Sequence, residues 1–351
     1  MEEVKQLRYE QITAFVSELF TKAGMSRENA EWYAVTIANA NLRGIDSHGI
    51  LRVPVYFERV LCGAINPQPR FKVEQVAPAL HLIDADGTAG CIAGKQAMEM
   101  AIASARQYGV SVSGVINSNH FGAAAQYAQL AVDQGMVGVS MTNVPALLAA
   151  PGVKKKLIGN NPLAIGVPTY CDFPFMLDMS MSVVAEGKLR FAASKGMKIP
   201  TTWAADADGN PTDNPEAALK GFLLPVGGYK GLGLAYAVDV LSGVITGGAF
   251  ADKLKSMYRN PKDPMQVCHL FAALNIDALI TRDELRLRMQ YYHDYLSTAP
   301  LADGAASLCF PGEIEHHCEL ERRKNGIPVP LSTIEALEKL KEAYGVKASL
   351  E

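Results

Sequence analysis

The sequence predicts an α/β (α+β) fold in which a helical segment precedes a sheet domain with helices packed on it. Apolar residues recur at helical spacing as far as Leu61, whereas from Leu80 onwards short β-branched runs alternate with alanine-rich helical stretches. Between the two parts, Asn66-Pro67-Gln68-Pro69 has the proline spacing of a linker.

Three helices are predicted in the N-terminal part. The first covers residues 8–24 and ends at a glycine, as many helices do. The second follows Ser26, a residue type favoured at helix N-caps, and stops at Gly44. The third covers about residues 51–61 and holds Pro54 in its first turn, where proline is tolerated.

The rest of the chain is predicted to alternate strands with helices. The predicted strands are residues 80–84, 110–117, 137–142, 163–167, 175–178 and 269–273. The predicted helices are residues 92–107, one that ends near Ala131, one that starts after Gly231, and residues 282–297 and 331–344. We predict a helical domain over residues 1–72, with residues 282–351 packed on it, and an α/β domain over residues 73–281.

Composition and charge exclude several classes of protein. The 351 residues carry a formal net charge of −3 and a mean hydropathy of +0.06. A protein with this charge lacks the excess of positive charge that binds nucleic acid or an anionic membrane. The run Lys154-Lys155-Lys156 is expected to be a solvated face. The charged start lacks the apolar stretch of a secretory signal, and no apolar run is suited to crossing a membrane. Six cysteines without CxxC pairing are typical of reduced thiols, so we expect a cytoplasmic protein.

The stretch Gly-Ile-Asp-Ser-His-Gly-Ile-Leu-Arg over residues 44–52 gathers chemically active side chains. Ser47 precedes His48, Arg52 follows four positions later, and Tyr56 four beyond that. The last three would share one face of a helix, and they stay close if His48 lies on the loop before a helix that starts near residue 51. They supply an imidazole, a guanidinium and a phenol. The alternative interpretation is a helix cap, a buried histidine and a surface arginine.

Further candidates lie where strands are predicted to end. His120 is located between a strand and a helix, where ligands collect in open α/β sheets, although a histidine that caps the helix fits equally well. Asp178-Met179-Ser180 ends another strand with an acid and a hydroxyl suited to a ribose. The amides of Gly227-Gly228-Tyr229-Lys230-Gly231 and the Lys230 side chain could hold an anionic ligand such as a phosphate. The alternative there is a glycine-rich turn with a solvated lysine.

Three other patterns argue against a calcium loop, a zinc site and a Rossmann fold. Asp206-Ala207-Asp208-Gly209-Asn210 resembles the start of a calcium loop but lacks the closing glutamate, which favours a hairpin turn. His316-His317-Cys318, with Cys309 nearby, lacks zinc-site spacing and is predicted to lie on the surface. No GxGxxG motif occurs, which disfavours a doubly wound dinucleotide-binding fold.

Seven short motifs together resemble the malate/L-lactate dehydrogenase family, which also includes ureidoglycolate and sulfolactate dehydrogenases, diketogulonate reductases and cyclic-imine reductases. Their order and spacing agree over nearly the whole chain, which makes the set specific although each motif alone is weak. The motifs are Arg43-Gly44-Ile45-Asp46-Ser47-His48-Gly49, Ser118-Asn119-His120-Phe121-Gly122, Asn161-Pro162-Leu163-Ala164, Asp178-Met179-Ser180, Gly228-Tyr229-Lys230-Gly231, Asp239-Val240-Leu241-Ser242-Gly243 and Pro311-Gly312-Glu313.

The resemblance implies an NAD(P)-dependent oxidoreductase on a sheet domain that is not of the Rossmann type, in a homodimer with the cofactor near the subunit interface. The implied cofactor is NAD or NADP, with NAD favoured. The residues implied at the substrate end are Ser47, His48, Arg52, Tyr56 and His120, and those implied as cofactor contacts are Asp178, Met179, Ser180, Lys230, Pro311, Gly312 and Glu313. Two positions depart from the common family pattern, Asn160 in place of threonine and Tyr229 in place of histidine.

These residue types suit the oxidation of a small 2-hydroxy acid. An imidazole can take the hydroxyl proton near neutral pH, and Arg52 can hold the carboxylate through two hydrogen bonds. We favour His48 as the acid/base and His120 as the group that polarises the substrate oxygen, and the reverse assignment stays open. Ureidoglycolate, a cyclic imine acid or a diketo acid is the alternative substrate.

Two other classes of function are kept as alternatives. A metal-dependent hydrolase would use His48, His120 and Asp84 as its functional groups. A non-catalytic structural protein would bind no nicotinamide nucleotide.

Overall fold

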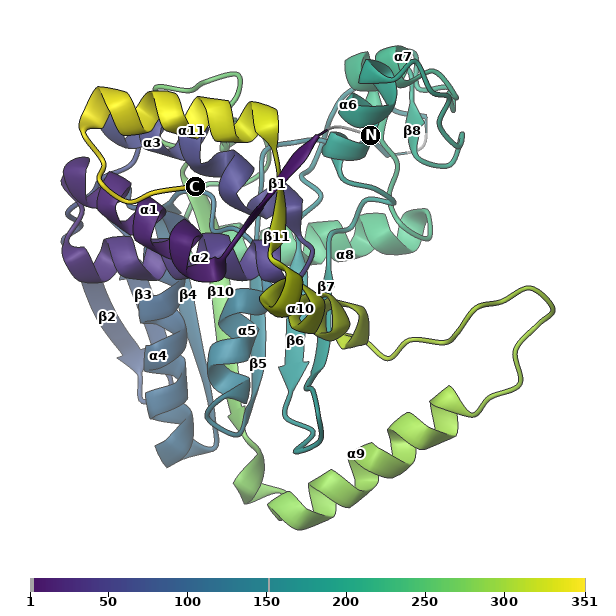
Figure 1. The fold of residues 1–351 in the computed structure, drawn as a ribbon. Coiled ribbons are helices and arrows are strands. Elements are labelled where there is room, and N and C mark those ends of the chain that lie inside the picture. The colour runs from purple at the N-terminus through teal and green to yellow at the C-terminus, as the bar shows by residue number, and fades with distance from the viewer. Residues whose placement is uncertain (1–2, 151, 351) are drawn as a thin grey trace.

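One seven-stranded sheet organises the molecule (Figure 1). The computed structural model describes residues 3–150 and 152–350. The strand order is β2-β3-β4-β10-β5-β6-β7, and every neighbouring pair is antiparallel except β3 with β4. The strands are β2 (Lys72–Ala77), β3 (Leu80–Asp84), β4 (Val110–Ser118), β5 (Met136–Thr142), β6 (Leu163–Val167), β7 (Phe175–Met179) and β10 (Val267–Asn275). The six predicted strands are therefore present, and β2 is an edge strand that the sequence analysis missed.

Helices cover both faces of this sheet. On one face lie α4 (Gly90–Tyr108) and α5 (Ala125–Val132), and on the other α8 (Tyr229–Asp239), which continues as a π-helical turn over Val240–Val244. Alternate residues of β5 serve the two faces: Ser140 Oγ donates to the Ala124 carbonyl beside α5, whereas Met141 packs in the core under α8. Glycine is required at position 138, because a Cβ there would meet the Ala128 carbonyl oxygen at 2.4 Å.

The N-terminal helices and the C-terminal segment pack together. The three predicted helices are observed as α1 (Tyr9–Lys22), α2 (Arg27–Leu42) and α3 (Val53–Leu61). Ser26 Oγ accepts a hydrogen bond from the Asn29 amide, and Pro54 lies in the first turn of α3, as predicted. The partners from the chain ends are β1 (Val4–Leu7), α10 (Glu313–Asn325), β11 (Ile327–Pro330) and α11 (Leu331–Tyr344).

Strand pairing joins the two ends of the chain. Strand β1 runs antiparallel to β11, with Val4 opposite Pro330 and Leu7 opposite Ile327. The Glu18 carboxylate on α1 accepts hydrogen bonds from the amides of Lys347 and Ala348. Both ends therefore contribute to one hydrophobic core with α1, α2 and α3.

A small lobe lies beside the sheet (Figure 1). It contains α6 (Glu186–Ser194), α7 (Pro215–Lys220) and the two-stranded sheet of β8 (Ala204–Ala205) with β9 (Phe222–Leu223). The Asp206 carboxylate accepts hydrogen bonds from the amides of Asp208 and Asn210. These acceptor bonds to backbone amides close a tight turn, as the sequence predicts for this stretch.

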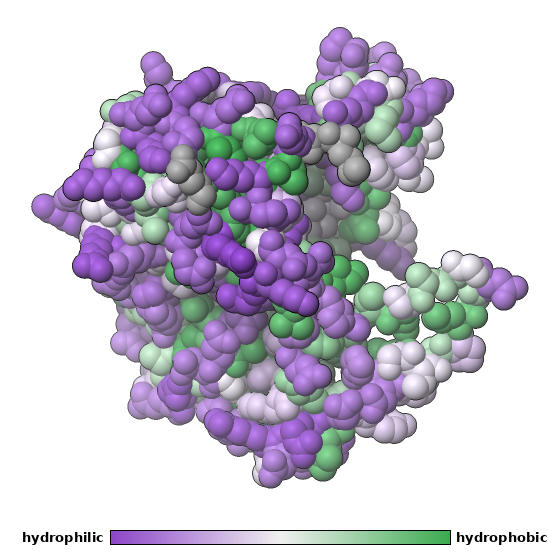
Figure 2. All heavy atoms as spheres, viewed as in Figure 1, coloured by the Kyte–Doolittle hydropathy of each residue, from purple (hydrophilic) through white to green (hydrophobic). Residues whose placement is uncertain are grey.

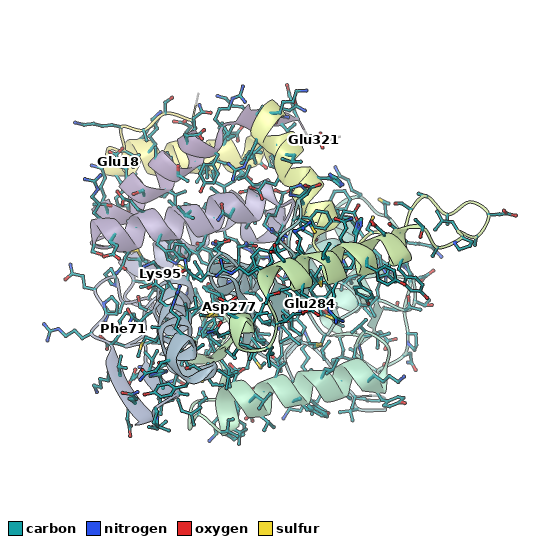
Figure 3. The ribbon with its side chains drawn as sticks, turned by 90° about the horizontal axis from the view of Figure 1, so that it is seen from below. Glu18, Phe71, Lys95, Asp277, Glu284 and Glu321 are labelled. Atoms are coloured by element: carbon teal, nitrogen blue, oxygen red, sulfur yellow. The ribbon has the colours of Figure 1, made fainter. Side chains whose placement is uncertain are left out.

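Helix α9 (Arg282–Ser297) lies apart from the N-terminal helices (Figures 1 and 3). None of its residues is buried. Exposed apolar residues, including Leu301 and Leu308, occur on the projecting segment that follows it (Figure 2). Of the C-terminal region, α10 and α11 contact the N-terminal helices. The division into domains stays a prediction.

Candidate active site

The stretch from residue 44 to 52 forms two short 3-10 turns at the entry to α3. These turns cover Asp46–His48 and Ile50–Arg52, with Gly49 between them. Asn41 Oδ1 accepts a hydrogen bond from the Ile50 amide at 2.7 Å, and a Cβ on Gly49 would meet that oxygen at 2.1 Å. Glycine therefore lets the Asn41 side chain hold the turns, and His48 lies on the loop before the helix.

Two imidazoles from separate elements, the loop before α3 and the segment after β4, lie next to each other at this site. The rings of His48 and His120 are stacked, with centroids 5.5 Å apart and planes 22° apart. Ser47 Oγ lies 2.9 Å from His48 Nδ1, and Tyr56 Oη lies 2.7 Å from His120 Nδ1. The five residues predicted at the substrate end therefore form one cluster, which Arg52 completes as described below.

The hydrogen bonds at His120 define its tautomer. Its Nδ1 accepts from the Gly122 amide at 3.2 Å, and the Tyr56 hydroxyl can donate to the same nitrogen. The proton of the neutral ring therefore resides on Nε2. Burial, together with the nearby His48 and Arg52, holds the pKa of His120 well below 6.5, so the ring is neutral at pH 7.

His48 is also neutral at physiological pH. Burial, with a smaller contribution from the Arg52 charge, lowers the pKa of His48 to about 4. Both rings retain some exposure to solvent. A pair of neutral imidazoles at a solvent-accessible position can accept one proton and donate another.

Arg52 is fixed along one edge. Its Nε donates to the Ser47 carbonyl at 2.6 Å, and its guanidinium lies over the ring of Tyr258 at 5.6 Å from the centroid. Within the described chain, Nη1 and Nη2 make no hydrogen bond to protein. These two terminal nitrogens are thus available to a ligand carboxylate.

A second arginine, which the sequence analysis missed, supports the loop from behind. Arg322 on α10 binds both oxygens of the Asp46 carboxylate, at 2.6 and 2.9 Å, and also donates to the Asn41 carbonyl. Asn41 Nδ2 donates to Asp46 at 2.6 Å. No local pattern could pair residues 46 and 322, because tertiary folding alone brings them together.

The sheet side of the site contains the predicted cofactor residues at the end of β7. Asp178 Oδ2 accepts from the Ala125 amide at 2.8 Å, which ties β7 to the start of α5 just after His120. Asp178 is exposed to solvent, yet desolvation by the protein atoms crowded around it raises the pKa of its carboxyl to about 6. Ser180 Oγ bonds Ser182 Oγ, whereas the Met179 side chain packs into the adjoining core.

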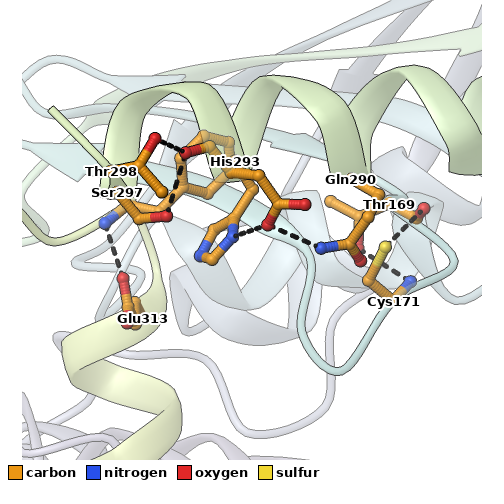
Figure 4. Close-up of polar contacts among 9 residues, drawn as sticks. Thr169, Cys171, Gln290, His293, Ser297, Thr298 and Glu313 are labelled. Atoms are coloured by element: carbon orange, nitrogen blue, oxygen red, sulfur yellow. Dashed lines mark hydrogen bonds and ion pairs between the residues drawn. The ribbon is translucent and has the colours of Figure 1, made fainter.

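The Pro311-Gly312-Glu313 motif lies directly beside β7. The Met176 amide donates to the Pro311 carbonyl at 3.0 Å, and a Cβ on Gly312 would meet Met176 Cβ and the Pro174 carbonyl oxygen, each at 3.0 Å. Glu313 begins α10, and its carboxylate accepts from the Phe310 amide (Figure 4). Glycine is thus required at position 312, because the start of β7 occupies the space of a side chain and the backbone has φ +95°.

A backbone hydrogen bond brings the turn that precedes Lys230 to the end of β7. The Val226 amide donates to the Met181 carbonyl, so the turn before α8 lies next to the residues that follow β7. Contrary to the sequence prediction, α8 begins at Tyr229 rather than after Gly231, because Gly228 with φ +64° ends the turn as the N-cap. Lys230 is therefore exposed in the first helical turn, where cationic and amide groups favour an anion.

The two departures from the family pattern have different environments. Asn160 Nδ2 donates to Ser182 Oγ at 3.3 Å, and the Asn160 carbonyl accepts from the Met181 amide. Asn160 therefore adjoins the end of β7. Tyr229 is 74% exposed at the start of α8.

A third histidine supports the residue after His120. His269 on β10 is fully buried, with Thr142 Oγ1 2.7 Å from its Nδ1 and Ser118 Oγ 2.8 Å from its Nε2. Its ring stacks on Phe121 with centroids 4.8 Å apart. Burial lowers the pKa of His269 to about 3, so this ring is neutral and serves to hold Phe121.

The side chains considered for a metal do not converge. Asp84 accepts from the Asp86 amide and from Asn117 Nδ2. His316 and His317 lie on α10, one partly and one fully exposed. Residues 3–150 and 152–350 contain neither a group of three metal-ligand side chains nor a helix long and apolar enough to cross a membrane.

Comparison with known proteins agrees with this architecture. The family model for malate/L-lactate dehydrogenase matches residues 7–338. Malate dehydrogenase of Pyrococcus abyssi is 36% identical over 96% of this chain and 94% of its own length. L-sulfolactate dehydrogenase of Methanocaldococcus jannaschii is 36% identical over 97% of both proteins. The solved sulfolactate dehydrogenase from that organism superposes with a TM-score of 0.93 and covers 99% of this chain and all of the other.

Other relatives act on different small acids, according to their names. They include the ureidoglycolate dehydrogenase (NAD(+)) of Escherichia coli K12 and a Δ1-pyrroline-2-carboxylate/Δ1-piperideine-2-carboxylate reductase of Pseudomonas putida, 34% and 33% identical over 91% and 71% of this chain. All of these names describe oxidoreductases of small acids. The chain therefore belongs to the malate/L-lactate dehydrogenase family and is an oxidoreductase acting on small acids.

Proposed function

We propose that this protein transfers a hydride between a nicotinamide dinucleotide and a small 2-hydroxy or 2-oxo acid of the malate or lactate type. NAD is favoured over NADP. The observation that carries the proposal is the stacked pair His48 and His120 beside an arginine whose terminal nitrogens are available. An acid/base, a polarising donor and a carboxylate clamp are what this reaction requires of a protein.

The residues at the end of β7 fit a dinucleotide. Asp178 and Ser180 would bind ribose hydroxyls, and Lys230 with the first amides of α8 would hold phosphates. The Pro311-Gly312-Glu313 segment, which packs against β7, would contribute further contacts to the cofactor. When bound, the nicotinamide supplies the site that accepts or returns the hydride.

Each substrate-end residue then has a defined task. Arg52 would bind the carboxylate through Nη1 and Nη2 and so orient the reacting carbon. His120 would donate from Nε2 to the substrate oxygen, since its Nδ1 is occupied by Gly122 and Tyr56. His48, neutral because of its lowered pKa, would take the hydroxyl proton during oxidation and return it during reduction, with Ser47 orienting the ring.

The test is a cofactor titration followed by a substrate screen. NADH and NADPH are titrated by quenching of protein fluorescence, and the tighter cofactor is then used with malate, lactate and sulfolactate and their 2-oxo forms. Turnover with a 2-hydroxy or 2-oxo acid supports the proposal. Failure of both reduced cofactors to bind would overturn it.

A second candidate is a dehydrogenase of ureidoglycolate or a reductase of cyclic imine or diketo acids, since relatives bear the first two of these names. The same residues would serve, because each substrate has a carboxylate next to the carbon that is reduced or oxidised. A kcat/KM for ureidoglycolate or a cyclic imine acid that exceeds that for malate would favour this candidate.

A homodimer is the assembly that we propose. Helix α9 presents Leu287, Tyr291 and Tyr295, each more than 60% exposed, and apolar residues exposed along one helix favour a partner. The chain continues from α9 towards Pro311, so a partner covering α9 would lie near the cofactor residues. Light scattering after gel filtration should give twice the chain mass, and the double variant Tyr291→Glu, Tyr295→Glu should be monomeric.

A further inference from the structure

An open recess lies between the small lobe and the segment around residues 251–259. Its cavity volume is about 500 Å³, and basic side chains from three separate segments line it. They are Lys154, Lys155 and Lys156 from the loop after β5, Lys220 from the end of α7, and Arg259. The recess contains none of the residues assigned above to the substrate or the cofactor.

The charge in this recess is not balanced by protein acids. Asp252 is the acidic residue in the lining, and Lys154 pairs with Asp208 at 3.0 Å. Among the residues that the structure describes, the other four cations make no ion pair. Lys156 is partly buried, and its pKa is lowered by burial and by the positive charges of Arg259 and Arg190, with Glu186 opposing the shift. Cations that repel one another around a cavity bind an anion favourably.

The walls are held in place by buried polar contacts. Arg59, 1% exposed, donates to the carbonyls of Pro261 at 2.7 Å and Asp263 at 2.8 Å, and thereby fixes the loop that bears Arg259. On the second wall, the Ala251 amide donates to the Asp239 carboxylate. On the third, the Leu148 amide donates to the Ile158 carbonyl and the Leu148 carbonyl accepts from the Leu157 amide, which closes the base of the lysine loop. The backbone segments that carry the cations are therefore fixed around the recess before a ligand binds.

We propose that this recess is a second anion-binding site, which takes a small polyanion carrying phosphate groups or several carboxylates. Lysine and arginine side chains bind both groups through charge-assisted hydrogen bonds, and the volume suits a ligand of that size. Tyr258, next to Arg259, lies over the guanidinium of Arg52. Arg259 in the recess wall is thus the chain neighbour of a residue that contacts the proposed substrate clamp.

The test is calorimetric titration of the intact protein with inorganic pyrophosphate and, separately, with citrate at constant ionic strength. The recess variant is Lys156→Gln with Lys220→Gln. Its matched control, Lys72→Gln with Lys339→Gln, removes the same charge from exposed positions outside the recess. We expect saturable binding to the native protein and the control, and affinity at least about tenfold lower in the recess variant. The tighter of the two probes identifies phosphate or carboxylate as the ligand group.

Two results would overturn the proposal. One is the absence of saturable binding of both probes to the native protein, and the other is equal affinity in the native protein and the recess variant. Thermal unfolding of each variant checks that it is folded, and if the double variant is not, Arg259→Gln takes its place in the same comparison. Binding of NADH is measured in parallel, so a failure of the anion site is distinguishable from a failure of the proposed oxidoreductase function.

Discussion

The imidazoles of His48 and His120 stack with their centroids 5.5 Å apart, although 72 residues separate them in the chain. One ring comes from the loop before α3 and the other from the end of β4. Neither is protonated easily, because burial and the Arg52 charge lower the pKa of both rings and His48 further lowers the pKa of His120. The pair therefore provides two neutral rings whose roles differ through their hydrogen-bond partners.

The first prediction concerns which of these rings is the acid/base and which donates a hydrogen bond to the substrate oxygen. His48→Gln should lower kcat by at least about 100-fold, since it removes the proposed acid/base. His120→Gln keeps a side-chain N–H that can donate to the substrate oxygen, and it should cost less. Steady-state kinetics of both variants check this expectation, and a larger loss of kcat in His120→Gln would assign the acid/base role to His120.

The second prediction concerns Arg52. Arg52→Lys keeps the charge but loses the two parallel donors, so KM for the acid should rise about 10–100-fold with a smaller change in kcat. The matched control is Arg27→Lys, at an exposed ion pair on α2. An unchanged KM in Arg52→Lys would remove the carboxylate clamp from the mechanism.

Removing Arg322 tests the support of the catalytic loop. Arg322→Met leaves the buried side of Asp46 without its partner, and we expect a loss of about 1–3 kcal/mol in the free energy of unfolding and roughly tenfold in kcat. The NADH dissociation constant should stay close to that of the native protein. Urea denaturation and kinetics measure the two effects, and a normal kcat in the folded variant would contradict a positioning role.

Acid sensitivity should depend on His269. Its pKa is about 3 in the folded protein and 6.5 in the unfolded chain, so between these values the unfolded chain binds a proton that the folded protein does not. The free energy of unfolding contributed by His269 is constant above about pH 7 and falls by about 1.4 kcal/mol per unit as the pH decreases from 6.5 towards 3. In His269→Gln this slope should diminish, whereas in His317→Gln, at an exposed position, it should persist. Denaturant midpoints measured from pH 7 to pH 4 provide the comparison.

Cofactor affinity should also depend on pH through Asp178. Its pKa of about 6 means that the carboxylate becomes ionised, and able to accept two ribose hydroxyl bonds, as the pH rises through 6. NADH should therefore bind more tightly at pH 7 than at pH 5, and Asp178→Asn should bind weakly at both. Fluorescence titrations at the two pH values check it, and an equal pH response in Asp178→Asn would assign the effect to another group.

Periodic sequence patterns were sufficient for most of the fold. The helices that begin at Tyr9 and Arg27 were predictable from apolar residues at helical spacing and, for the second, from its capping residue. The strands from β3 to β7 were predictable from their short apolar and β-branched runs. Strand β2 escaped prediction because it is a polar edge strand whose residues are mostly exposed. Helix α10 escaped because its charged sequence has no buried residue and little periodicity.

The same distinction applies to the site. Ser47, His48, Arg52 and Tyr56 could be grouped from sequence because they are near neighbours in the chain, and His120 through its position at a strand end. Arg322 and His269 could not, since their partners are more than 100 residues away. Lys154-Lys155-Lys156 was expected to be a solvated face, and Lys154 and Lys155 are exposed; the three lysines also line a recess whose other walls come from distant segments, which sequence could not show.

The pairing of β1 with β11, and the bridge from Arg322 to Asp46, have a consequence for biosynthesis. A nascent chain emerging from the ribosome can complete its seven-stranded sheet only once β10 has been translated, and the histidine-bearing loop gains its support later still, after translation has passed residue 322. A truncated product that stops near residue 310 would therefore contain every reactive group and still lack the brace that sets their geometry.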